Sequence, residues 1–78
     1  MKQIKVLSEL RAHEVGKVKQ ITGQDQLRRK LLDMGVIPGS ALEVLRVAPL
    51  GDPVEIRVKG YNLSLRKEEA KQVQIEVL

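Results

Sequence analysis

The residues able to hold a metal ion are few. His13 is the only histidine, Glu9 and Glu14 are its carboxylate neighbours, and the chain has no cysteine. A zinc site needs three or four converging nitrogen, sulfur or oxygen ligands, and iron(II) prefers histidine and carboxylate ligands with open positions. One histidine in a segment with little structural pattern does not meet this need. The sequence therefore predicts a solvated loop histidine, no specific metal site and no cofactor.

The residues needed for nucleophilic catalysis or for phosphate binding are also missing from the sequence. No serine has a histidine and an acid that can be assigned to it as triad companions. Gly35, Gly39, Gly51 and Gly60 stand singly, each at a predicted turn, and none belongs to the G-x-x-x-x-G-K-[ST] pattern that cradles phosphates. The sequence therefore predicts that the protein is not an enzyme.

Arg28, Arg29 and Lys30 form the one basic run of the chain. They are predicted to lie on a helix, away from its apolar face. Two interpretations stay open at this point. The run is either a solvated helix surface or a contact for an acidic partner or a phosphate group.

The overall charge raises the question of nucleic acid. The formal net charge is +4 and the pI is about 9.7, which suits nucleic acid or an acidic protein. The basic residues are interleaved with acids, and Tyr61 is the only aromatic residue, too few for the stacking platform that single-stranded nucleic acid uses. The alternative function is nucleic-acid binding by a small basic barrel. A salt titration would identify it, because phosphate contacts give a steep loss of affinity with increasing salt.

Length and composition limit the number of domains, the make-up of the core and the location of the protein. The chain has 78 residues, which favours a single domain over residues 1–78, and its core must be built from Val, Ile and Leu because Phe and Trp are absent. No run approaches the roughly 18 apolar residues of a membrane helix, so no membrane insertion is expected. Charges interrupt the apolar residues of the N-terminal segment, unlike a signal peptide. The expected location is the cytoplasm.

The clearest periodic segment lies at residues 51–70. Its apolar residues alternate with polar ones, so Val54, Ile56, Val58, Leu63 and Leu65 are predicted to face a core. Tyr61 has the same parity and is predicted to be a core residue too. Further strands are predicted at residues 15–22, 40–48 and 73–77, with a short one at residues 4–6 followed by a helical turn capped by Ser8.

One helix is predicted at about residues 24–34. Leu27, Leu31 and Met34 share one of its faces, Thr22 is expected to cap its N-terminus, and Gly35 suits the left-handed position after its last turn. Another helical turn is predicted at residues 67–71. Together these elements favour an all-β fold, a small antiparallel barrel of about five strands with one inserted helix, of the SH3-like or OB type.

The order and spacing of several short motifs resemble the FeoA family. They are Met34-Gly35 followed by Pro38-Gly39, the run from Ala48 to Pro53, Lys59-Gly60-Tyr61 with Leu63 and Leu65-Arg66, and finally Glu69-Ala70. The resemblance covers nearly the whole chain. It implies an SH3-like barrel, a cytoplasmic location and no catalytic residues. It further implies a role in bacterial ferrous-iron uptake through contact with the cytoplasmic GTPase region of the FeoB transporter.

Three apolar residues are not obviously buried by barrel parity and suggest a docking surface. They are Leu32, which lies off the apolar helix face, Ile37 before the Pro38-Gly39 turn, and Leu50 at the tip of the next turn. An apolar group with a charged rim is typical of an interface. The predicted partner contacts are therefore Leu32, Ile37, Leu50, Arg28, Arg29 and Lys30. The partner is the transporter or, by self-association, another copy of the chain. The alternative is that Leu32 and Ile37 plug one end of the barrel.

Overall fold

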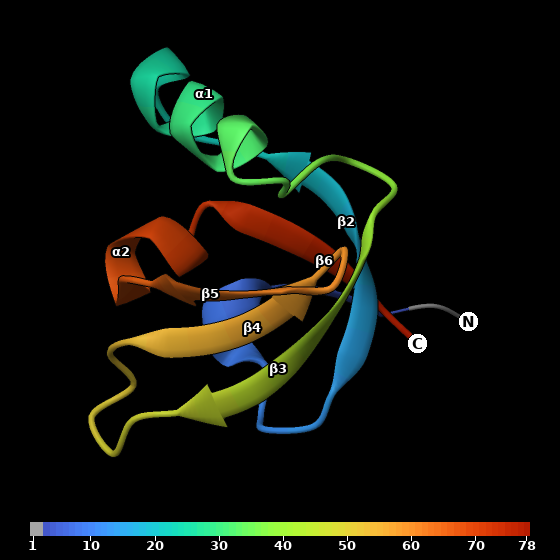
Figure 1. Cartoon of the computed structure of the whole chain (residues 1–78), viewed down its shortest axis with the longest axis vertical. Helices are drawn as coiled ribbons and strands as arrows, with labels where there is room; N and C mark the ends of the chain where they lie inside the picture. The colour runs from blue at the N-terminus through green and yellow to red at the C-terminus, as the bar shows by residue number, and fades with distance from the viewer. Residues whose placement is uncertain (1–2) are drawn as a thin grey trace.

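Alternating apolar and polar residues produce strands along most of the chain. The structure, a computed structural model, describes residues 3–78, so the first two residues of the predicted 1–78 domain lie outside it. The elements in chain order are β1 (Gln3–Val6), the 3₁₀ helix η1 (Leu7–Glu9), β2 (Val15–Ile21), α1 (Asp25–Asp33), β3 (Ala41–Val47), β4 (Val54–Val58), β5 (Tyr61–Leu65), α2 (Lys67–Ala70) and β6 (Val73–Val77). Figure 1 shows α1 standing at one end of the curled sheet.

The strands form one six-stranded antiparallel sheet in the order β1-β6-β2-β3-β4-β5. The register shifts between Val18 and Gln20 on β2 and between Val44 and Arg46 on β3. Such bulges bend a strand and increase its twist, so the sheet curls around its apolar face. The predicted all-β class with one helix inserted after a long strand is confirmed. The short strand predicted at residues 4–6 is present as β1, and the sheet has six strands where about five were predicted.

The curled sheet encloses an aliphatic core. Val54, Ile56, Val58 and Leu65 are fully buried, and Leu63 packs against them, as the alternation predicts. No polar or charged residue is buried within residues 3–78. Removal of this apolar surface from water, at about 25 cal/mol per Å², is therefore the main stabilising contribution.

Tyr61 does not belong to the core, and this part of the prediction is wrong. Its side chain is 70% exposed. Tyr61 is the first residue of β5, directly after the Lys59-Gly60 turn, and β5 has a neighbouring strand on only one side. Alternation decides which face a side chain occupies, but the inward face is left uncovered at this corner of the sheet.

Helix α1 packs on the core through the predicted face. Leu31 is fully buried and Leu27 and Met34 pack against the core cluster. The helix ends as Gly35 takes a φ of 95°. Gly35 N–H donates to Leu32 O and Val36 N–H donates to Leu31 O, both at 3.0 Å. This is a Schellman motif, and its two apolar partners, Leu31 and Val36, are both buried.

Both predicted caps are wrong. Ser8 lies inside η1, and the turn begins instead with Glu9 Oε1 accepting the Val6 N–H at 3.0 Å. At α1 the N-terminal flanking residue is Gln24, with no side-chain cap. Thr22 Oγ1 donates to Gln72, the residue directly before β6, because the sheet brings that partner beside it.

Candidate partner-binding surface

Helix α1 is attached to the sheet on both sides. Before it, Thr22 N–H donates to Gln72 O at 2.7 Å and Thr22 Oγ1 donates to Gln72 Oε1 at 2.9 Å. After it, Gly39 N–H donates to Val18 O at 2.7 Å, and Val18 N–H donates to Ser40 O at 2.9 Å. These bonds connect the segments before and after the helix to β6 and β2. They fix the position from which α1 presents its outer face.

Leu32 stands between two shallow depressions on this outer face. One, of about 290 Å³, is lined by Gln20, Ile21, Arg28, Leu32 and Pro38. The other, of about 250 Å³, is lined by Asp25, Arg28, Arg29, Leu32 and Asp33. Leu32 and Arg28 thus border both. These lining residues, with Ile37 beside Pro38 in the chain, are called the Leu32 surface below.

The Leu32 surface has an apolar centre and a charged rim. Leu32 and Ile37 each keep 37% of their area exposed, so each packs partly on the protein and is partly open to solvent. Arg28, Arg29 and two aspartates supply the rim. Leu32, Ile37 and the two arginines are predicted contacts from the sequence, whereas Gln20 and Ile21 are not, since nothing in the sequence places the end of β2 beside α1.

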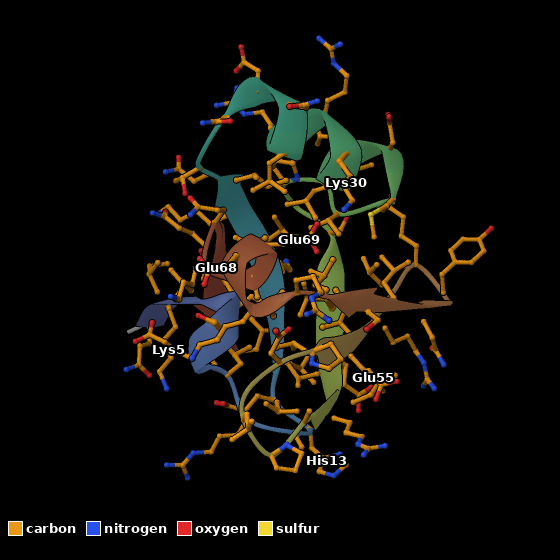
Figure 2. All side chains as sticks on the ribbon, turned by 90° about the vertical axis from the view of Figure 1, so that its left-hand side faces the viewer. Lys5, His13, Lys30, Glu55, Glu68 and Glu69 are labelled. Carbon is orange, nitrogen blue, oxygen red and sulfur yellow. The ribbon has the colours of Figure 1, made fainter. Side chains whose placement is uncertain are left out.

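Lys30 belongs to a different environment. Its Nζ lies 2.6 Å from Glu69 Oε2, which joins α1 to α2, and Figure 2 shows the two side chains meeting between these helices. Glu69 Oε1 also accepts the Arg66 N–H at 2.9 Å, which caps α2. The hydrogen bond from Lys30, and next the one from Arg66, lower the pKa of Glu69 from its ordinary value of 4.5. Lys30 therefore holds two helices together rather than lining the Leu32 surface.

Leu50 is the most exposed of the predicted contacts, at 88%. It sits in the turn closed by Gly51 N–H donating to Ala48 O at 2.7 Å. Asp52 braces this loop, because its carboxylate accepts the Lys67 N–H at 3.0 Å and lies 3.4 Å from the Arg66 guanidinium. Figure 1 shows this β3–β4 loop at the end of the molecule away from α1. The structure thus separates Leu50 from Leu32 on α1.

His13 is exposed and lies at the end of the molecule opposite Lys30 (Figure 2). Its backbone has a φ of 76° and its N–H donates to Val44 O at 2.6 Å. Within residues 3–78 no three His, Cys, Asp or Glu side chains come together as metal ligands. In the same part of the chain, no helix is long and apolar enough to cross a bilayer.

The curled six-stranded sheet and its single end-on helix define an SH3-like domain. A structure of FeoA from Stenotrophomonas maltophilia, described as a prokaryotic SH3 domain protein in complex with zinc, has a TM-score of 0.78 and 28% identity to this chain. The match covers 97% of this chain and 89% of that one. The family model named FeoA domain matches residues 5–77. The chain belongs to the FeoA family.

Two further relatives are similar over nearly the whole chain. The solution structure of an FeoA-like protein from Clostridium acetobutylicum has a TM-score of 0.89 and 41% identity, covering all of this chain and 91% of that one. A protein from Porphyromonas gingivalis, called an Fe(2+) transport protein A/Fe(2+) transporter FeoB fusion protein, is 36% identical over 72 residues. That match takes in 92% of this chain but only 8% of the relative's length.

Proposed function

We propose that the chain is a non-enzymatic cytoplasmic accessory protein of bacterial ferrous-iron uptake. Its partner is the cytoplasmic GTPase region of an FeoB-type transporter, and it binds that partner through the Leu32 surface. Binding involves no cofactor and no metal held by this chain. The protein influences transport by contact alone.

The fusion in the relative from Porphyromonas gingivalis is the observation that carries this proposal. There an FeoA part and a transporter share one polypeptide, and the part resembling this chain is 36% identical to it. Covalent linkage keeps two modules at a high effective concentration. A chain that is not linked must obtain the same proximity from an interface of its own.

The Leu32 surface has the make-up that such an interface needs. Interfaces place apolar anchors at the centre and polar or charged side chains at the rim, as Leu32 and its flanking arginines do. The depressions on either side of Leu32 offer space for side chains of the partner. Arg28 and Arg29 favour acidic groups opposite them, since each guanidinium can bind a carboxylate through two parallel hydrogen bonds.

Co-purification of the transporter tests the partner and the surface together. Tagged protein is used to recover full-length FeoB from detergent-solubilised membranes of the same host, and FeoB is quantified by mass spectrometry. The wild type and Leu50→Ser should recover FeoB equally, and Leu32→Ser should recover at least about tenfold less, as expected for a central anchor. Leu50→Ser is the matched control because it makes the same substitution at an exposed leucine outside the Leu32 surface.

Two results would contradict the proposal in different ways. Loss of FeoB with Leu50→Ser but not with Leu32→Ser would move the contact to the β3–β4 loop. No recovery of FeoB by the wild type would remove the transporter as partner. Circular dichroism of each variant confirms that it is folded before its binding is compared.

A further inference from the structure

Strand β5 is an open edge of the sheet. It lies at the end of the strand order and pairs only with β4. An edge strand presents unpaired N–H and C=O groups that can accept another strand. The other edge strand, β1, carries Lys5, and β5 differs from it in a way that matters for pairing.

Strand β5 is the only one of the six described strands without a charged residue. Its sequence is Tyr-Asn-Leu-Ser-Leu, whereas every other strand of the sheet holds at least one Lys, Arg, Asp or Glu. Charges on an edge normally prevent pairing with another chain. This edge has no such protection, and Tyr61 at its start is largely exposed.

The turn before β5 determines which of its backbone N–H and C=O groups point away from β4. Lys59 and Gly60 have φ values of 52° and 81°, the left-handed pair of a type I′ hairpin turn. Such a turn places Val58 and Tyr61 in a hydrogen-bonded pair, and pairs alternate along an antiparallel ladder. Asn62 and Ser64 therefore direct their N–H and C=O groups away from β4, and no hydrogen bond is found for these groups within residues 3–78.

We propose that β5 pairs with β5 of a second copy of this chain to form an antiparallel two-fold dimer. The register sets Asn62 opposite Ser64 of the second copy, and Ser64 opposite its Asn62. Each pair exchanges both of its N–H···O bonds, so this symmetric register uses every outward group of the two residues. Leu63 then faces Leu63 of the second copy across the axis.

The side chains agree with this register. Tyr61 comes opposite Leu65 of the second copy, which is already buried in its own chain, so the exposed ring covers the end of that strand without competing with a charged side chain. Leu63, which packs on the core at the open edge, gains its own counterpart. No like charges meet along the strand, because β5 has none. The sheet becomes continuous across the two copies.

Removal of one outward N–H tests the pairing. Ser64→Pro deletes the N–H and places a ring in the interface, while the Ser64 amide is not needed for pairing with β4, so the monomer fold is retained. Ser64→Ala keeps the N–H and is the matched control. Sedimentation equilibrium should show a concentration-dependent dimer for the wild type and Ser64→Ala. Ser64→Pro should raise the dissociation constant by about tenfold or more.

A cysteine at the axis gives a second test that does not depend on proline. Residues opposite each other in a non-hydrogen-bonded pair have Cα atoms about 4.5 Å apart, within the range of a disulfide. The chain has no cysteine of its own. Leu63→Cys should therefore form a covalent dimer rapidly under mild air oxidation. Leu50→Cys, far more exposed but outside the pairing, should form one only slowly.

Four outcomes would overturn the proposal. The first is a wild type that stays monomeric up to about millimolar concentration. The second is a dimer that Ser64→Pro does not weaken. The third is a cross-linking rate for Leu63→Cys no higher than that of Leu50→Cys. If hydrogen exchange at Asn62 and Ser64 slows only when the transporter's cytoplasmic region is added, the edge accepts a strand of that partner and the dimer is refuted.

Discussion

Leu31 and Leu32 are neighbours on α1, but one is a core residue and the other a surface residue. The loss of stability on substituting each by alanine should therefore differ. Leu31 is fully buried, whereas Leu32 keeps 37% of its area exposed. Leu31→Ala leaves a cavity beneath the helix and should cost about 3–5 kcal/mol. Complete burial of a leucine side chain contributes about 1.5–3 kcal/mol. Leu32→Ala should therefore cost about 1–2 kcal/mol at most, because part of that side chain is already in water.

Urea unfolding followed by far-ultraviolet circular dichroism measures the difference. A single small core supplies roughly 3–5 kcal/mol, so Leu31→Ala should be largely unfolded without denaturant. With a slope of about 1 kcal/mol per molar urea, Leu32→Ala should keep a folded baseline and unfold at about 1–2 M lower urea than the wild type. Equal destabilisation by the two substitutions would refute the reasoning. It would show that Leu32 is a plug of the barrel and not a docking residue.

Three other predictions concern the core, a helix contact and metal. Ile56→Ala should lower the free energy of unfolding by about 2–5 kcal/mol and Glu55→Ala by less than about 0.5 kcal/mol, and equal melting temperatures would contradict the inside–outside assignment. Glu69→Gln should cost less than about 1 kcal/mol at pH 7, because Lys30 is exposed. Since folding lowers the pKa of Glu69, its stabilisation is present above the unfolded pKa near 4.5 and is lost as the pH falls through the folded pKa. The urea midpoints of wild type and Glu69→Gln should therefore converge as the pH falls below the folded pKa of Glu69, and a constant gap would refute the assigned cause. Anaerobic calorimetry with Fe²⁺ should show no stoichiometric submicromolar site, and finding one would refute the absence of a metal centre.

Local patterns in the sequence predicted the elements well because they report local geometry. The alternation at residues 54–65 identified β4 and β5 and their buried residues, and the Leu27–Leu31–Met34 spacing identified the packed face of α1. Gly35 ended that helix as predicted, because only the left-handed conformation allows the bonds that close its last turn. In each case the deciding interaction lies within a few residues along the chain.

The sequence is least informative where residues distant in the chain decide the outcome. Thr22 was expected to cap α1, but the sheet supplies Gln72 as a closer partner. Lys30 is predicted as a partner contact from its place in the basic run, and the sequence does not indicate that its ammonium group also pairs with Glu69 on α2. Leu50 was grouped with Leu32 because both are apolar and unburied, and only the path of the chain shows that they stand at different ends. Periodicity does not contain this information.

Titration of the protein into the isolated cytoplasmic GTPase region of FeoB from the same host tests the central claim most directly. Isothermal titration calorimetry should show saturable binding for the wild type, with a negative heat-capacity change because apolar surface at Leu32 is buried. Leu32→Ser, which stays folded, should bind at least about tenfold more weakly. Absence of measurable binding by the folded wild type at about 100 µM of both proteins would contradict the account.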